Sequence, residues 1–189
     1  MMYKRSFWLV RRRVSTSLRG SGDAFVPIES RPTEWNDWMA DARRVAENAL
    51  QTGDVPVGAL VVGPLGERLA EGWNTRERDA DPCGHAEIQA LRAAAQRLGS
   101  WRLEGCTVVV TLEPCAMCAG AMVLARIKRC VYGASDPKGG FLGSLGNLGE
   151  DARLNHRFLV VGGIEAEACA AQLRAFFRSL RRASKAARG

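Results

Sequence analysis

Two cysteines three residues apart, Cys115 and Cys118 in the stretch TLEPCAMCAGAM, have the spacing of metal ligands. Zinc in proteins usually takes four ligands, so two thiolates supply half of a site. The stretch GHAEIQAL, upstream in the chain, offers His85 as a third ligand. Three protein ligands leave a fourth position for water, which distinguishes a catalytic zinc site from a structural one. The sequence therefore predicts that His85, Cys115 and Cys118 bind catalytic Zn²⁺.

The same stretch contains Glu87, which a site of this kind does not need as a ligand. Beside a zinc-bound water, its carboxylate can take a proton and return it to a leaving group. Glu87 is therefore the predicted catalytic residue. The alternative is one buried histidine and two core thiols without a metal.

The predicted helices place these side chains at helix starts. Residues two apart on a helix do not share a face, so His85 and Glu87 can reach one pocket only from a first turn. Cys115 and Cys118 are three apart and do share a face. Pro114 suits the first helical position, where its missing N–H is not needed. Both helices then direct their N-termini at one point, which favours the thiolates that zinc requires.

The rest of the chain alternates between helical and strand patterns from Thr33 onward. Apolar spacing and turn residues predict helices at about 33–52, 85–98, 114–124 and 165–182. Short apolar runs predict strands at 55–63, 67–74, 106–112, 128–134 and 157–164, with a glycine-rich loop over about 135–156. This alternation predicts an α/β domain layered around a single sheet.

Charge is unevenly distributed along the 189 residues, whose net charge is +7. Residues 1–22 and 174–189 each contain six basic and no acidic residues, whereas the part between them is mildly acidic. We predict a basic N-terminal extension over 1–30, one domain over 31–182 and a basic tail over 183–189. The extension has three open interpretations: a disordered arm, a transit peptide or a start assigned too early. Basic ends commonly bind nucleic acid, although they can simply keep a protein soluble.

Composition excludes two other classes of protein. The chain contains no apolar run near the roughly 20 residues that cross a bilayer, so we expect no membrane partner. Six cysteines in a chain of this size are not typical of a secreted disulfide scaffold. A reducing, cytoplasmic location is expected, with organellar targeting by the N-terminal extension left open.

The pattern H-A-E followed by P-C-x-x-C is that of zinc-dependent nucleobase deaminases. Beyond this pattern, the chain from about residue 33 to 182 resembles the bacterial tRNA-specific adenosine deaminases. The stretches that carry the resemblance are VPVGALVV, EGWN, DPCGHAEIQAL, GSWRLEGCTVVVTLEPCAMCAGAM, YGASDPKGG, GSL, LNHR and AFFRSLR.

This resemblance implies a cytidine-deaminase-like fold, a three-layer α/β/α sandwich with a central mixed five-stranded sheet. It also implies a homodimer with one Zn²⁺ per subunit. The implied reaction is hydrolytic deamination of adenosine to inosine at wobble position 34 in the anticodon stem-loop of tRNA, with an arginine tRNA as the expected substrate.

Substrate contacts follow from the resemblance as well. The resemblance implies that Asn74 hydrogen-bonds the purine and that the backbone of Ala86 lines the same pocket. It also implies that Asp136 and Lys138 belong to a loop that contacts the anticodon backbone. By the same resemblance, Asn155 and Arg157 belong to a second substrate-facing turn. Asn74 can alternatively just end a strand, and the other polar side chains can be ordinary solvated loop residues.

Three further residues have open interpretations. Phe176 and Phe177, near the basic end of the last helix, either face the RNA or pack in the core, and we expect at least one to be buried. Cys83 lies close enough to His85 to raise the alternative of a fourth thiolate, which would close the zinc site.

Two rival functions remain open. A guanine or cytosine deaminase that acts on a free base shares the zinc pattern. A non-catalytic zinc module that binds RNA would share the metal, but a structural site has no use for the unligated carboxylate of Glu87.

Overall fold

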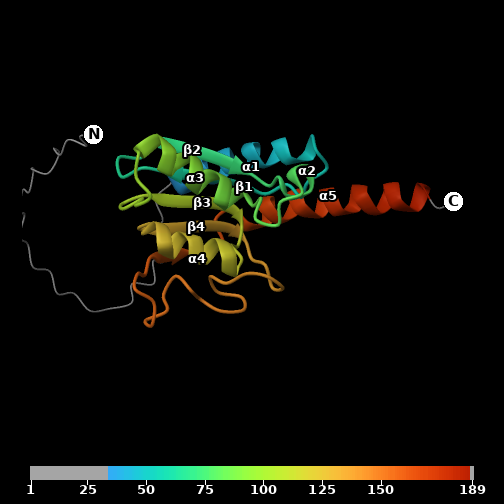
Figure 1. The fold of residues 1–189 in the computed structure, drawn as a ribbon. Coiled ribbons are helices and arrows are strands. Elements are labelled where there is room, and N and C mark those ends of the chain that lie inside the picture. The colour runs from blue at the N-terminus through green and yellow to red at the C-terminus, as the bar shows by residue number, and fades with distance from the viewer. Residues whose placement is uncertain (1–33, 188–189) are drawn as a thin grey trace, which may run out of the picture.

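A single five-stranded sheet forms the centre of the computed structural model, which describes residues 34–187 (Figure 1). Its strand order is β2-β1-β3-β4-β5. The strands are β1 Gly58–Val62, β2 Arg68–Trp73, β3 Thr107–Leu112, β4 Arg129–Ala134 and β5 Leu159–Val161. β1 pairs antiparallel with β2 and β3, whereas β3, β4 and β5 pair in parallel. The predicted mixed sheet is therefore confirmed.

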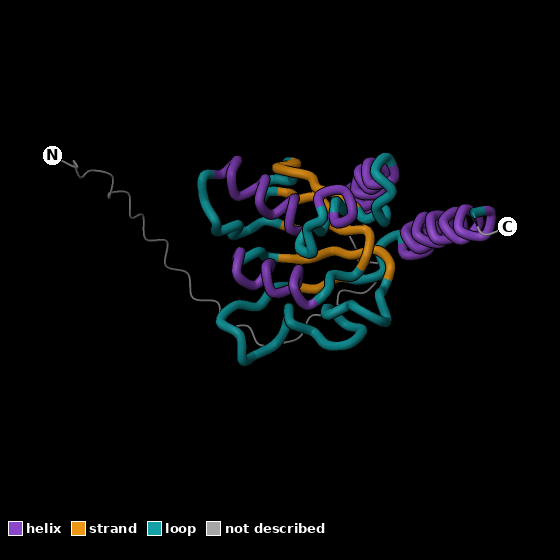
Figure 2. The backbone as a smooth tube through the Cα atoms, turned by 45° about the vertical axis from the view of Figure 1, so that its right-hand side comes forward, coloured by secondary structure: helices purple, strands orange, loops and turns teal. Residues whose placement is uncertain are grey.

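Helices cover both faces of this sheet, as Figure 2 shows from a second direction. The helices are α1 Glu34–Leu50, α2 Arg76–Asp79, α3 Ala86–Leu98, α4 Ala116–Ala125 and α5 Ala166–Ala186. α1 and α5 pack on one face, and α3 and α4 pack side by side on the other. The predicted three-layer α/β/α sandwich is confirmed.

The central strand β3 shows why two apolar layers form. Val108 and Val110 belong to the core under α3 and α4, whereas Val109 belongs to the core under α1 and α5. Successive side chains of a strand point to opposite faces, so a strand covered on both sides reads as a continuous apolar run. The sequence TVVVTL is such a run.

The sheet also brings the two metal-binding segments together. His85 is the N-cap of α3 and Cys115 is the N-cap of α4, and these helices lie beside each other on one face. The prediction that Pro114 opens a helix is wrong, because α4 begins at Ala116. The Pro114 carbonyl instead accepts a hydrogen bond from the N–H of Phe141 at 2.8 Å, which ties the start of α4 to the long loop after β4.

Other boundaries differ from the predictions at the ends of elements. α2 is a short helix within a segment that was expected to be a loop, β5 has only three residues, and α5 continues to Ala186. No described helix is both long and apolar enough to span a membrane. The predictions for residues 1–30 and the predicted helix start at Thr33 fall outside the described residues. The division into 1–30, 31–182 and 183–189 remains a prediction.

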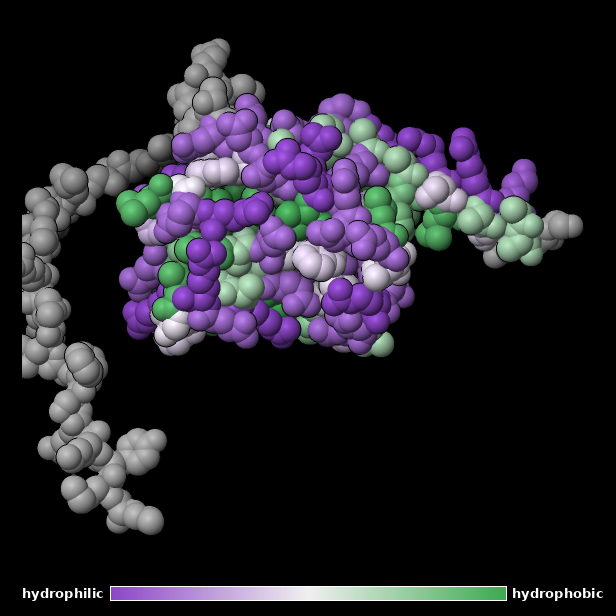
Figure 3. All heavy atoms as spheres, turned by 90° about the horizontal axis from the view of Figure 1, so that it is seen from above, coloured by the Kyte–Doolittle hydropathy of each residue, from purple (hydrophilic) through white to green (hydrophobic). Residues whose placement is uncertain are grey.

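The outer part of α5 extends away from the sheet, and Figure 3 shows apolar surface along it. Phe177 is 41% exposed and Phe176 is only partly buried. The expectation that at least one of them is buried is wrong, because α5 packs on the sheet only through its first turns, where Cys169 is buried.

Candidate active site

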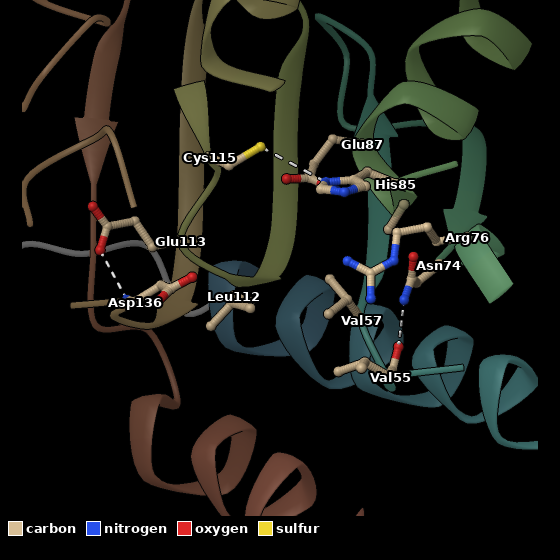
Figure 4. A pocket seen from close by; sticks show the side chains of 11 residues that line it. Val55, Val57, Asn74, Arg76, His85, Glu87, Leu112, Glu113, Cys115 and Asp136 are labelled. Atoms are coloured by element: carbon tan, nitrogen blue, oxygen red, sulfur yellow. Dashed lines mark hydrogen bonds between the residues drawn. The ribbon is translucent and has the colours of Figure 1, made fainter. Parts of the chain in front are cut away.

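A pocket of about 200 Å³ opens at the N-termini of α3 and α4 (Figure 4). This volume lies below the range of about 300 to 1,000 Å³ that is usual for drug-sized ligands, and it suits a single base. The lining residues are Val55, Val57, Asn74, Arg76, His85, Ala86, Glu87, Leu112, Glu113, Cys115 and Asp136. Six of the predicted site residues therefore line this pocket: Asn74, His85, Ala86, Glu87, Cys115 and Asp136.

Three donor atoms at the base of this pocket form a compact group. His85 Nδ1 lies 3.7 Å from Cys115 Sγ and 3.6 Å from Cys118 Sγ, and all three donors lie within 4.8 Å of one another. A tetrahedral zinc with ordinary Zn–N and Zn–S bond lengths separates such ligands by about 3.6 Å. The donor set and its spacing therefore fit Zn²⁺, and this is the predicted zinc site.

Without metal, the two thiols would share one proton. A hydrogen bond from Cys118 lowers the pKa of Cys115 to about 4, with His85 and the Cys118 N–H adding to the effect. The same hydrogen bond, together with burial, raises the pKa of Cys118. Zinc requires both thiolates, so metal binding releases the remaining proton.

Glu87 is buried beside this group, at 4% exposure. In Figure 4 its carboxylate lies next to the His85 ring and faces Cys115. Burial raises the pKa of Glu87, which favours the protonated form of a group placed to carry a proton. The structure thus brings Glu87 to the three ligands, as predicted, from the first turn of α3.

Asn74 also lines the pocket, beside Arg76 (Figure 4). Its Nδ2 donates a hydrogen bond to the Val55 carbonyl at 3.2 Å, which leaves Oδ1 free to accept one from a base edge. Asn74 is 8% exposed and directly follows the last residue of β2. Ala86, at the start of α3, is fully buried at the same pocket.

Arg76 also lines the pocket, and the sequence reasoning did not single it out. It belongs to α2, which the buried carboxylate of Asp54 holds in place by accepting the N–H groups of Glu77 at 2.7 Å and Arg78 at 3.2 Å. A short helix within a polar segment carries no periodic signal, so only the fold shows that Arg76 reaches the site.

Asp136 is the member of the predicted RNA-binding loop that reaches the pocket. Its Oδ1 accepts the N–H groups of Lys138 at 3.0 Å and Gly139 at 3.1 Å. Lys138 is exposed and does not line the pocket. Glu113 lies beneath this loop and is a second lining residue that the sequence reasoning missed, although it directly precedes P-C-x-x-C.

The turn with Asn155 and Arg157 lies outside the pocket, and both residues are exposed. The carbonyl oxygen and Oδ1 of Asn155 each accept a hydrogen bond from Arg126 at 2.9 Å, which fixes the turn against the end of α4. His156 is hydrogen-bonded to the Ile127 carbonyl and lies apart from the metal ligands. The substrate-binding roles of this turn stay predictions.

Cys83 is exposed, and the cluster of close donors within residues 34–187 consists of His85, Cys115 and Cys118 without it. The alternative of a closed four-ligand site therefore gains no support from the geometry. His85 and Cys115 line the pocket, so a zinc ion held by the three ligands would be accessible from it, as in a catalytic centre.

Comparison with known proteins agrees with this geometry. The sequence model of the cytidine and deoxycytidylate deaminase zinc-binding region matches residues 32–134. A tRNA-specific adenosine deaminase of Bacillus subtilis (strain 168) is 48% identical over 151 residues, which cover 80% of this chain and 93% of that protein.

Two solved structures share the fold. A structure from a study of A-to-I editing by tRNA:A34 deaminases at the wobble position of transfer RNA is 38% identical, with a TM-score of 0.69 over 72% of this chain and 98% of that chain. The guanine deaminase of Nitrosomonas europaea is 25% identical, with a TM-score of 0.64 over 75% of this chain and 83% of that chain.

Fold and site are thus those of a zinc-dependent deaminase. The chain belongs to the cytidine and deoxycytidylate deaminase family, within which the Bacillus subtilis relative is a tRNA-specific adenosine deaminase.

Proposed function

We propose that this protein is a zinc-dependent tRNA deaminase that converts adenosine 34, at the wobble position, to inosine, with an arginine tRNA as substrate. The observation that carries the proposal is the convergence of three zinc ligands and the buried Glu87 carboxylate on one base-sized pocket. The extensive identity to a tRNA-specific adenosine deaminase supports tRNA as the substrate.

The reaction adds water at C6 of adenine and releases ammonia. When bound, zinc supplies a Lewis acid that lowers the pKa of water. Glu87 takes one proton from the attacking water and passes it to the ring nitrogen N1. It then takes the remaining proton from the new C6 hydroxyl group and passes it to the departing amino group, so both protons of the water are transferred. Its burial excludes bulk water from these transfers.

The pocket reads a base that has left the anticodon stack. Asn74 accepts a hydrogen bond from the base through Oδ1, while its Nδ2 stays bonded to Val55. Asp136 and Lys138, on the adjoining loop, contact the RNA backbone, and Asn155 with Arg157 forms a second contact farther out. RNA loops are commonly bound in this way, by splayed bases and backbone contacts.

Inosine formation in an arginine tRNA anticodon stem-loop tests this function, with free adenosine, guanine and cytosine assayed beside it. We expect inosine at position 34 and no turnover of the free compounds. If only guanine or cytosine were turned over, the zinc chemistry would be correct but the substrate would be a free base instead of tRNA.

Glu87→Ala separates an enzyme from a zinc-binding RNA module. We expect the variant to keep its zinc and lose at least about 100-fold in kcat, which is the lower end of general acid–base contributions. Zinc content is measured by elemental mass spectrometry, and Glu71→Ala, on the exposed side of β2, is the matched control. Full activity of Glu87→Ala would remove the proposed proton shuttle.

A homodimer is the proposed working form. α3 and α4 lie side by side, and three apolar side chains are exposed at their C-terminal ends or just beyond: Leu98 (45%), Trp101 in the loop after α3 (60%) and Leu124 (68%). Clustered exposed apolar side chains commonly mark a protein interface. Light scattering should therefore report a dimer that Leu124→Arg dissociates, whereas Leu65→Arg, in the turn between β1 and β2, should leave it intact. A monomeric unmodified protein would contradict the proposal.

A further inference from the structure

Glu113 is a buried carboxylate, 2% exposed, and four hydrogen-bond donors surround it. Its Oε1 accepts the N–H groups of Leu142 at 3.1 Å and Ser144 at 2.9 Å. Its Oε2 accepts the N–H of Asp136 at 3.0 Å and the hydroxyl of Ser144 at 2.5 Å. All four donors belong to one loop, 136–144, and an acceptor-only carboxylate is the side chain that can satisfy them together.

The backbone on either side of Glu113 holds the same loop. Phe141 donates its N–H to Pro114, and the backbone of Gly140 pairs with that of Cys115. A Cβ atom at Gly140 would lie only 2.2 Å from the carboxyl carbon of Glu113, so the loop can approach this closely only with glycine there. The loop is therefore built around this carboxylate.

We infer that Glu113 is a positioning residue that fixes loop 136–144 at the mouth of the pocket and so presents Asp136 and Lys138 to the RNA backbone. The inference rests on the proposed function, because RNA is the ligand that the loop would meet. Asp136 accepts N–H groups of its own turn, so its carboxylate is oriented only while that turn is held in place.

The expected kinetic signature is a change in KM. Loop contacts to the RNA backbone are the same before and during the chemical step, so weakening them raises KM and leaves kcat nearly unchanged. If the loop is ordered in only a fraction of molecules, the apparent affinity falls by that fraction. Loss of a residue with a merely structural role would instead reduce zinc content or the melting temperature.

Glu113→Gln is the direct test. It keeps the shape of the side chain but replaces one acceptor oxygen with an –NH₂ group, which cannot accept a hydrogen bond from the N–H donors of the loop. We expect KM for the stem-loop to rise about tenfold, with kcat within about twofold and zinc content unchanged. Amide hydrogen exchange in loop 136–144 should accelerate by at least about tenfold. Glu150→Gln is the matched control, since Glu150 is an exposed carboxylate bonded to Asn147.

A milder variant guards against a folding defect. Ser144→Ala removes one of the four donors and leaves the three backbone bonds, so we expect KM to rise about threefold. In an Asp136→Ala, Lys138→Ala background, adding Glu113→Gln should raise KM by less than about twofold, because the groups that it positions are gone.

Two results would overturn the inference. The first is that Glu113→Gln raises KM as much in the Asp136→Ala, Lys138→Ala background as it does alone. The second is that Glu113→Gln alone leaves amide exchange in loop 136–144 unchanged. Exchange needs no substrate, so it remains informative if the stem-loop is not turned over. If the unmodified protein did not deaminate the stem-loop but exchange changed as expected in Glu113→Gln, the proposed function would be wrong. The role of Glu113 in holding the loop would still stand.

Discussion

The backbone of Cys115 pairs with that of Gly140 in an isolated antiparallel bridge, so a zinc ligand and the loop over the pocket share one hydrogen-bonded contact. A side chain at Gly140 would collide with the carboxyl group of Glu113, which is buried and cannot withdraw. The spacing between the metal site and the loop is therefore set by a residue without a side chain.

Gly140→Ala should consequently raise KM for the RNA and lower the free energy of unfolding by about 1 to 3 kcal/mol, the usual cost of overpacking. Gly146→Ala, two residues beyond that loop, is the matched control. Its new Cβ would lie 3.2 Å from the Phe141 ring, which can shift. Urea unfolding and stem-loop kinetics measure both variants, and equal effects would contradict the steric account.

Removing one metal ligand should abolish zinc binding. Cys118→Ser leaves two strong ligands, and we expect zinc content to fall from about one ion per chain to near zero, together with activity. Cys83→Ser should keep full zinc content, because this exposed thiol lies outside the donor cluster. Elemental analysis after dialysis against a chelator measures both, and zinc loss in Cys83→Ser would revive the four-ligand alternative.

Arg76 should contribute to RNA affinity through charge. It lines the pocket and donates one hydrogen bond, to the exposed Glu77 at 3.2 Å. Arg78, on the same short helix, does not line the pocket and donates two hydrogen bonds to Asp79, at 2.7 and 2.8 Å. Arg76→Ala should raise KM and reduce the slope of log KM against log salt concentration by about one, as expected for the loss of a single phosphate contact. Arg78→Ala is the control, and an equal change in slope there would show that general surface charge explains the effect.

Thiol labelling should separate exposed from buried cysteines. Burial raises the pKa of Cys169 to about 11, so this thiol stays protonated at pH 8 while the exposed Cys83 remains accessible. Iodoacetamide should label Cys169 more than about 100-fold more slowly than Cys83 in the native protein. Peptide mass spectrometry measures both, and the two rates should become similar in denaturant.

The raised pKa of Cys169 also predicts how the free energy of unfolding changes with pH. The unfolded thiol loses its proton near its ordinary pKa of about 8.5, before the folded thiol does, so folding binds a proton between about pH 8.5 and 11. The stabilisation that the protonated Cys169 thiol gives the folded state is therefore fully present below this pH window. It is lost as pH rises through the window. The free energy of unfolding should fall less steeply across the window in Cys169→Ala than in the unmodified protein.

The amino-acid sequence by itself determined the zinc ligands, the layered fold, and the order of the helices and strands except for the short α2. These features depend on local spacing: a thiolate pair three residues apart, a helix start at His85, and the continuous apolar run of β3. Such patterns are written within short segments and can be read without knowing what packs against them.

Only the tertiary structure decided which polar residues reach the pocket. Arg76 and Glu113 line it because Asp54 anchors α2 and because a loop folds back over the start of α4. Phe176 and Phe177 are not buried, because α5 packs on the sheet only near its start, where Cys169 is buried. Long-range hydrogen bonds and the extent of packing join segments far apart in the chain, and no local periodicity encodes them.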